Sequence, residues 1–126
     1  GAARAISLVI PDLAGKLDGM AFRVPVVTGS VVDIVVQLEK TASAEEVNAA
    51  LKAAANSDGW LGKVFNFSDE PLVSSDYIGD PASSTVDGLS TADMGDGFVK
   101  VVTWYDNEWG YSNRLADIAA YVAEKL

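Results

Sequence analysis

Residues 98–114 read FVKVVTWYDNEWGYSNR, in which a segment of strand character passes directly into one of helical character. Phe98–Tyr105 reads as a strand, in which successive side chains point to opposite faces. Residues 105–111 form a dense polar and aromatic junction. Beyond the junction, an apolar stripe at helical spacing predicts an amphipathic helix, and its members are Leu115, Ile118, Ala119, Val122 and Leu126.

Two further helices are predicted upstream. Apolar residues at helical spacing indicate a helix over residues 2–13, in which Pro11 ends the regular pattern. Ser43 and Glu46 form a capping box, so a second helix is expected to begin there. The run at residues 56–59, Asn-Ser-Asp-Gly, is typical of a helix end.

The remaining segments favour strands. Met20–Val24 alternates, which places Arg23 on one face and its apolar neighbours on the other, and Pro25 closes the strand. Ser30–Lys40 reads as a long strand with a mixed face and a dry face, the dry face made by Val32, Ile34, Val36 and Leu38. Shorter strands are predicted at 63–67, 72–78, 84–86 and 89–94, with turns at 79–81 and 95–97 between some of them.

Together these elements predict an α+β fold. The order is helix, two strands, helix, several strands, helix, and the late turns resemble those of hairpins. We therefore expect a mixed, mostly antiparallel sheet with helices packed on one face. No repeat and no linker divides the chain, so residues 1–126 are expected to form one unit.

The composition excludes several classes of function. Nine basic against 18 acidic residues give a formal charge of −9, which argues against nucleic acid and anionic membranes as partners. There is no cysteine and no histidine, so thiolate and imidazole chemistry and the usual zinc sites are excluded. No apolar run approaches the length of a membrane span, and no signal peptide is recognisable, so a cytoplasmic location is expected. The start at Gly1, without methionine or a helix cap, favours a cut through a longer protein over a processed terminus.

Six segments resemble, in the same order, the second half of the catalytic domain of glyceraldehyde-3-phosphate dehydrogenases. The resemblance covers essentially the whole chain, and it departs from the commonest family pattern at residues 26–29, which read VVTG. The segments are GAARA at 1–5, GKLDGMAFRVP at 15–25, SVVD and LEK within 30–40, VSSD at 73–76, SST at 83–85 and WYDNEWGYSNR at 104–114.

The resemblance implies that residues 1–126 are the C-terminal part of such a catalytic domain. The family's full chain also carries a Rossmann domain for NAD or NADP, a catalytic cysteine and a catalytic histidine, all upstream of the matching part. None of these is in this sequence, which contains no Gly-x-Gly-x-x-Gly motif. The family assembles as a homotetramer, so a homo-oligomer and the missing Rossmann part are the implied partners. No cofactor is expected on this chain alone, and no residue of it is expected to be catalytic or to bind metal.

For the substrate phosphate, the resemblance implies Arg23 and Gly1. A guanidinium presents a rigid fork of donors that suits phosphate oxygens. From the residue pattern alone, the favoured reading is that Arg23 pairs with a carboxylate across the sheet, such as Asp33, and the resemblance reverses this preference. Gly1 resembles a glycine whose amide binds phosphate at a helix N-terminus, although here it is the chain terminus itself.

For the nicotinamide, the resemblance implies Asn107 and Tyr111. An amide side chain can hold a carboxamide by donating and accepting at once. The alternative from the pattern is that Asn107 caps the last helix or lies in its turn, and that Tyr111 is a half-buried aromatic. Three aspartates do not have metal-ligand spacing and read as solvated or capping carboxylates: Asp33, Asp76 and Asp106.

Two functions follow from these observations. The first is part of a phosphorylating, NAD(P)-dependent dehydrogenase of carbon metabolism that acts on glyceraldehyde 3-phosphate, or on erythrose 4-phosphate. The second is a folded fragment or assembly module without turnover. Since no thioester can form on a chain that lacks cysteine, the sequence predicts that this chain is inactive by itself.

Overall fold

The computed structural model describes residues 2–126, with side chains described from residue 5 onward, so the predicted phosphate contact of Gly1 lies outside the described part. The elements along the chain are α1 (Ala2–Val9), a 3-10 turn η1 (Pro11–Leu13), β1 (Ser30–Gln37), α2 (Ala44–Ala55), α3 (Trp60–Val64), β2 (Phe65–Ser68), a second 3-10 turn η2 (Ser74–Tyr77), β3 (Ser84–Gly95), β4 (Phe98–Tyr105) and α4 (Trp109–Ala123).

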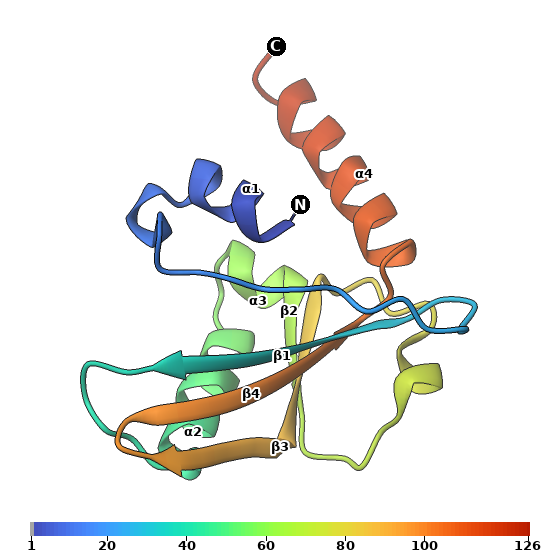
Figure 1. Ribbon diagram of the computed structural model, residues 1–126. Helices are drawn as coiled ribbons and strands as arrows, with labels where there is room; N and C mark the ends of the chain where they lie inside the picture. Colours follow the sequence, from blue (N-terminus) through green and yellow to red (C-terminus); the bar gives the residue numbers. More distant parts are fainter. Residues whose placement is uncertain (1) are drawn as a thin grey trace.

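The four strands form one sheet in the order β1-β4-β3-β2 (Figure 1). β1 and β3 both pair with β4 in antiparallel fashion, and β2 pairs with β3 in parallel. This arrangement confirms the predicted α+β class with a mixed, mostly antiparallel sheet. Ser30 lies opposite Tyr105 and Gln37 opposite Phe98, so the start of β1 meets the end of β4. That register brings the residues just before Ser30 beside the residues that follow Tyr105.

β3 joins two predicted strands into one. It spans Ser84–Gly95 and keeps its pairing with β4 through register shifts between Asp87 and Ala92 and between Asp93 and Gly95. The turn into β4 uses backbone conformations that favour glycine, with φ of 85° at Gly95 and 80° at Gly97. The sequence prediction of a hairpin at residues 95–97 is therefore confirmed.

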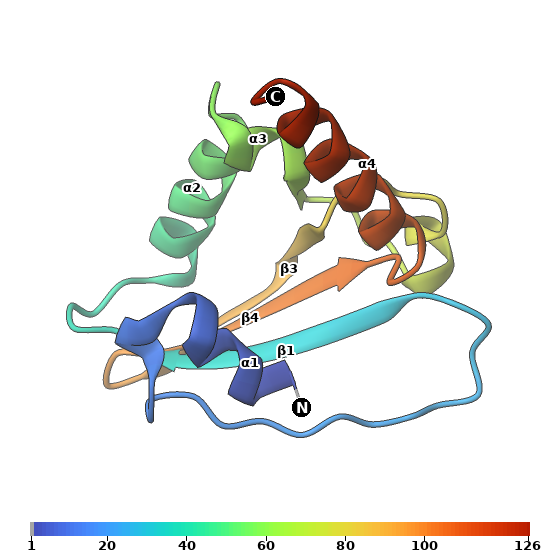
Figure 2. The same cartoon turned by 90° about the horizontal axis from the view of Figure 1, so that it is seen from above.

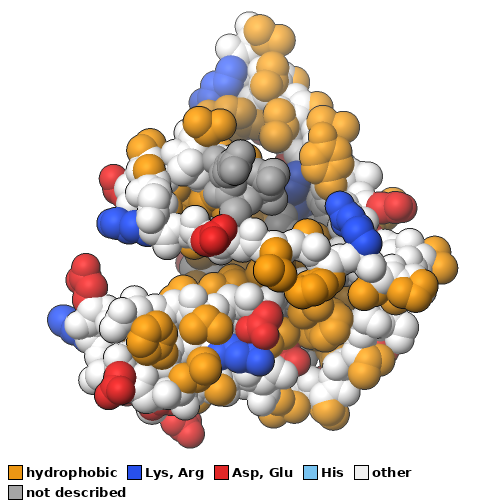
Figure 3. Space-filling view, viewed as in Figure 1, with side chains coloured by type: hydrophobic (Ala, Val, Ile, Leu, Met, Phe, Trp, Pro, Cys, Tyr) orange, Lys and Arg blue, Asp and Glu red, His pale blue; other side chains and the backbone are white. Residues whose placement is uncertain are grey.

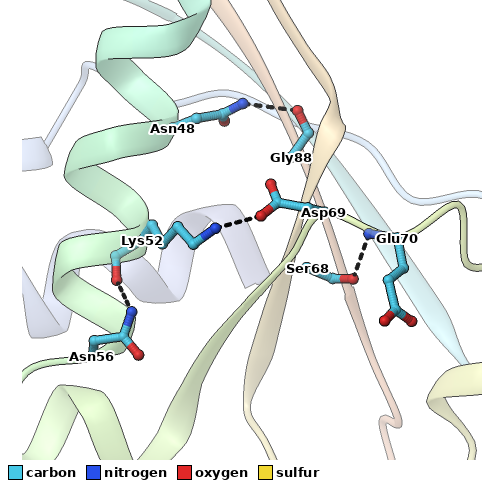
Figure 4. Close-up of polar contacts among 7 residues, drawn as sticks. All are labelled: Asn48, Lys52, Asn56, Ser68, Asp69, Glu70 and Gly88. Carbon is cyan, nitrogen blue, oxygen red and sulfur yellow. Dashed lines mark hydrogen bonds and ion pairs between the residues drawn. The ribbon is translucent and has the colours of Figure 1, made fainter.

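α2 is the helix that packs against the sheet, where it contacts β2 and β3. It begins as predicted: Ser43 accepts a hydrogen bond from the Glu46 amide, and the Glu46 carboxylate accepts one from the Ser43 amide. The side chain of Asn48 donates to the Gly88 carbonyl at 2.8 Å, and Lys52 forms an ion pair with Asp69 (Figure 4). These contacts hold α2 over the two strands at the far edge from β1.

The strand predicted at Met20–Val24 is wrong for this structure. The segment is irregular, and Met20 and Phe22 are 82% and 80% exposed. A strand exists only where a neighbouring strand satisfies its backbone groups, and no described segment pairs with this one. The alternation is present in the sequence, but the partner strand that would make use of it is not among the described residues.

Two other strand predictions also differ from the structure. Within the segment predicted at 72–78, Ser74–Tyr77 form the 3-10 turn η2, because the Asp76 carboxylate accepts the Val73 amide at 2.7 Å and closes the chain locally. Lys63 and Val64 belong to the short helix α3, and strand β2 begins at Phe65. In both places local hydrogen bonds override a strand-like composition.

The core is small for a chain of this size. Only Tyr77, Ala82, Val86 and Val99 are buried apolar side chains among the described residues. The predicted dry face of β1 is only half covered, with Val32 39% and Ile34 38% exposed, because α2 covers β2 and β3 instead. α4 rises away from the end of β4, on the other side of the molecule from α2 (Figures 1 and 2).

Candidate functional site

The candidate site lies where β4 ends and α4 begins. β4 stops at Tyr105 and α4 starts at Trp109, which leaves a short connection. Because β1 runs antiparallel to β4, the residues just before Ser30 lie beside this connection. Hydrogen bonds at the site thus join two segments that are 77 or 78 positions apart in sequence.

Asp106 is the buried centre of the junction, with 4% of its surface exposed. One carboxylate oxygen accepts hydrogen bonds from the Thr28 hydroxyl at 3.2 Å and from the amides of Glu108 and Trp109 at 2.9 Å each. The other oxygen accepts the Gly79 amide at 2.9 Å. Asp106 thus connects the approach to β1, the loop after η2 and the first turn of α4.

These hydrogen bonds keep the Asp106 carboxylate charged. The amides of Gly79 and Trp109 make the largest contributions, and together with the other donors they lower the pKa of the Asp106 carboxyl from 3.8 to about 2, although burial opposes the shift. The buried charge is therefore compensated by donors from three segments rather than by a cation.

Asn107 uses only its oxygen within the chain. That oxygen accepts hydrogen bonds from the Gly29 amide and the Ser30 hydroxyl, both at 3.2 Å. The side-chain NH₂ group has no partner among residues 2–126, and the residue is exposed. Asn107 can consequently donate to a ligand, whereas the sequence had led us to expect donation and acceptance together.

The capping alternative for Asn107 is wrong. The residue at the N-cap of α4 is Glu108, whose side chain makes no capping hydrogen bond. The free amides of the first turn are instead satisfied by Asp106, two and three residues ahead of them. Asn107 lies in the turn before the helix, but its side chain faces the start of β1.

Tyr111 lies in the first turn of α4 and is 69% exposed, so its ring is available to a ligand rather than half-buried. An open pocket of about 410 Å³ lies at the junction, but Tyr111 is not among the residues that line it. The pocket is lined by Thr28, Ile78, Gly79, Asp106, Glu108, Trp109 and Ser112.

Arg23 lies in the irregular segment before β1 and is exposed. Its predicted alternative partner, Asp33, forms an ion pair with Lys100 at 3.1 Å instead. Among residues 2–126 the Arg23 guanidinium has neither a hydrogen bond nor an ion pair, and none joins it to the junction. The structure therefore leaves Arg23 free for an anion without bringing it together with Asn107.

The central part played by Asp106 is only partly evident from the sequence. A carboxylate just before a helix suggested a capping role, which the bonds to Glu108 and Trp109 confirm. Its bonds to Thr28 and Gly79 depend on the tertiary fold, and no local signal in the sequence indicates them.

Within residues 2–126, no cluster of three or more acidic side chains is arranged to hold a metal ion. None of the helices in the same range is long and apolar enough to cross a bilayer.

Comparison with known proteins gives a family. Residues 1–107 match the model of the glyceraldehyde 3-phosphate dehydrogenase C-terminal domain. Over 125 residues the chain is 58% identical to glyceraldehyde-3-phosphate dehydrogenase of Geobacillus stearothermophilus and 57% identical to glyceraldehyde-3-phosphate dehydrogenase 1 of Bacillus subtilis, covering 99% of this chain and 37% of each relative. The corresponding enzyme of Mycolicibacterium smegmatis is 56% identical over 100% of this chain and 36% of its own length. The chain thus spans little more than a third of the relatives it matches, and it belongs to the glyceraldehyde-3-phosphate dehydrogenase family.

Proposed function

We propose that this chain is the C-terminal part of the catalytic domain of a phosphorylating, NAD(P)-dependent glyceraldehyde-3-phosphate dehydrogenase. The observation that carries the proposal is the identity of 56% to 58% over nearly the whole chain to proteins of that name. The remaining two-thirds of the parent would supply the Rossmann domain, the cysteine and the histidine. The parent would be a cytoplasmic homotetramer.

Asn107 would hold the nicotinamide of the dinucleotide. Its free NH₂ group suits the carbonyl oxygen of a carboxamide, because its own oxygen is already engaged by Gly29 and Ser30. Tyr111 presents an exposed ring one helical turn further on, against which a flat heterocycle could pack. When bound, the dinucleotide supplies a hydride acceptor.

Arg23 would bind the phosphate of the substrate. Its guanidinium is exposed and has no acidic partner in the described part of the chain, since Asp33 is engaged by Lys100. A free guanidinium offers a phosphate two parallel hydrogen bonds as well as charge. Arg23 would thus hold the aldehyde substrate by its phosphate, and Asn107 would hold the dinucleotide by its nicotinamide. Groups elsewhere in the parent would make and break the bonds.

A full-length chimera tests this proposal. The Geobacillus stearothermophilus relative would keep its own sequence up to the start of the alignment and continue with residues 1–126 of this chain. We expect oxidation of glyceraldehyde 3-phosphate that requires both inorganic phosphate and NAD or NADP. Assays with erythrose 4-phosphate in parallel decide which aldehyde is preferred.

Two variants of the chimera assign the phosphate contact. Arg23→Ala should raise the KM for the aldehyde at least tenfold, since a charge-assisted pair contributes about 1.5–3 kcal/mol. Lys16→Ala removes an exposed positive charge from the same irregular segment and should leave the KM unchanged. A folded chimera without activity, or equal effects of both variants, would count against the proposed function.

A further inference from the structure

The junction contains a second polar residue whose contacts bear on the same site. Asp106 is the one buried carboxylate in the part of the chain that the structure describes. It accepts four hydrogen bonds, only two of which come from the helix it precedes. Helix capping therefore explains half of its contacts, and the bonds to Thr28 and Gly79 need another explanation.

The contacts of Asp106 and Asn107 run side by side. Asp106 binds the hydroxyl of Thr28, while Asn107 binds the next two residues, through the Gly29 amide and the Ser30 hydroxyl. Gly29 has φ of +94°, a conformation that side-chain-bearing residues rarely adopt, so the chain turns sharply between the two contacts. The position of Thr28 thus determines whether the Gly29 amide reaches the oxygen of Asn107.

The orientation of the Asn107 amide depends on that reach. An amide side chain has an acceptor end and a donor end of nearly the same shape, so it can rotate to present either one. The Gly29 and Ser30 donors select the orientation in which the oxygen faces the chain and the NH₂ group faces outward. Without them, a ligand carbonyl would meet the correct end of Asn107 only part of the time.

We infer that Asp106 is a positioning residue for nicotinamide recognition: it holds Thr28, and through it Gly29 and Ser30, so that Asn107 presents its donor end to the ligand. The inference rests on the proposed function, because it assumes that Asn107 contacts the nicotinamide. Both carboxylate oxygens of Asp106 are already engaged within the chain and the residue is 4% exposed, so its role is assigned through Thr28 and not through direct contact with the dinucleotide.

The test measures the dissociation constants of two ligands on the full-length chimera. One ligand is NAD or NADP, whichever the unmodified relative uses, and the other is the matching ADP-ribose compound, which lacks the nicotinamide. Asp106→Asn keeps the size of the side chain but places an amide donor where one carboxylate oxygen now accepts. We expect Asp106→Asn and Asn107→Ala each to raise the dissociation constant of the dinucleotide about three- to tenfold, which is the effect of one ordinary hydrogen bond. Binding of the ADP-ribose compound should change less than about twofold. The double variant should bind the dinucleotide no more weakly than the weaker-binding single variant, because both changes remove the same contact.

If Asp106→Asn does not fold, a second pair of variants tests the same contact from the side of Thr28. Thr28→Val removes the hydroxyl and keeps the shape, whereas Thr28→Ser keeps the hydroxyl. We expect Thr28→Val to weaken binding of the dinucleotide but not of the ADP-ribose compound. Thr28→Ser should bind the dinucleotide as tightly as the unmodified chimera does. In the 126-residue chain, amide exchange at Gly29 should accelerate in Thr28→Val and stay slow in Thr28→Ser. Asn48→Ala, which removes a hydrogen bond on α2, serves as a control for general destabilisation and should affect both ligands equally.

The outcomes separate the inference from the proposed function. In one outcome, Asn107→Ala weakens binding of the dinucleotide alone, whereas Asp106→Asn and Thr28→Val weaken binding of both ligands equally or of neither. The positioning role is then overturned, and the proposed function stands. If Asn107→Ala itself shows no selectivity, the nicotinamide contact is wrong, and the positioning role falls with it.

Discussion

Asp106 and Asn107 are neighbours in sequence and use their side chains in different ways. The carboxylate of Asp106 is buried and fully engaged, whereas Asn107 is exposed and keeps its donors free. Asp106 connects three segments by hydrogen bonds, and Asn107 faces solvent next to it. In the proposed function, stability and ligand recognition would thus be divided between two adjacent residues.

At this scale the depressed pKa of Asp106 predicts a pH dependence of stability. The folded-state pKa of about 2 lies below the ordinary value of 3.8, so the unfolded chain binds a proton more readily. The contribution, about 2 kcal/mol, should be fully present above pH 3.8 and lost as the pH falls towards 2. Urea unfolding of this chain and of Asp106→Asn between pH 2 and 7 measures it. The difference in the free energy of unfolding between the two proteins should shrink as the pH falls from 7 to 2. A difference that stays constant with pH would contradict the expectation.

The exposed guanidinium of Arg23 gives a second residue-scale prediction. One arginine without further donors should bind inorganic phosphate no better than millimolar, about −4 kcal/mol. Amide chemical shifts of the 126-residue chain during a phosphate titration measure this. The shifts near Arg23 should vanish in Arg23→Ala and persist in Lys16→Ala. Micromolar binding, or binding that survives Arg23→Ala, would show that other groups form the site.

At the scale of elements, α4 is held to the rest of the fold mainly at its first turns. Gly110 is buried there, and a Cβ at that position would lie 2.8 Å from the Ala82 carbonyl oxygen. Arg114 reaches the Ser83 hydroxyl at 3.3 Å and lies over the Trp60 ring at 5.9 Å. The rest of the helix extends into solvent, so its direction depends on these few contacts.

Substitution of Gly110 tests this close approach. Helix propensity alone would make Gly110→Ala stabilising by about 1 kcal/mol. The clash with a backbone oxygen should outweigh that gain and leave the variant about 1–2 kcal/mol less stable. Ala119→Gly, on the exposed part of α4, measures propensity alone and should cost about 1 kcal/mol. Denaturant unfolding of both variants decides the matter, and a stabilised Gly110→Ala would mean that α4 is not seated against Ala82.

At the scale of the whole molecule, the chain leaves an unusually large surface exposed. Its accessible surface is 9202 Å², whereas a folded monomer of this mass is expected to expose about 6,400 Å². Figure 3 shows hydrophobic side chains along α4 and across the middle of the molecule. The exposed apolar residues include Met20, Phe22, Val31, Val35, Leu115, Ile118 and Tyr121.

Such surfaces predict self-association of the isolated chain. Exposed apolar patches of this extent are usually covered by another chain. The formal charge of −9 opposes association, so added salt should strengthen it by screening the repulsion. Light scattering at tens of micromolar, at low and high ionic strength, should show dimers or larger species that increase with salt. A strict monomer under both conditions would contradict the expectation.

The isolated chain should also be inactive as a dehydrogenase. It has neither a cysteine to form a thioester nor a histidine to assist it. Incubation with glyceraldehyde 3-phosphate, phosphate and NAD or NADP should leave the absorbance of the reduced nicotinamide unchanged. Sustained turnover by pure material would overturn this, and the full-length chimera is the positive control.

Features whose causes are local could be predicted from the sequence. The capping box at Ser43 and Glu46, the strand character of Phe98–Tyr105 and the glycine turn at 95–97 act over a few residues, so their patterns predicted α2, β4 and the hairpin correctly. The family resemblance likewise came from the order of short segments, and the comparisons confirm it.

Features that depend on residues distant in sequence could not be predicted in this way, because they arise only when the chain folds. The alternation at residues 20–24 matches that of a strand, but a strand also needs a partner, and the pattern carries no information about where a partner lies. The pairing of Asp33 with Lys100, which leaves Arg23 free, required β1 and β4 to be brought together. The same register brings Thr28, Gly29 and Ser30 to Asp106 and Asn107. Residue types indicated which side chains could donate or accept hydrogen bonds, and the folded backbone selected the partners, because a hydrogen bond forms only between groups about 3 Å apart.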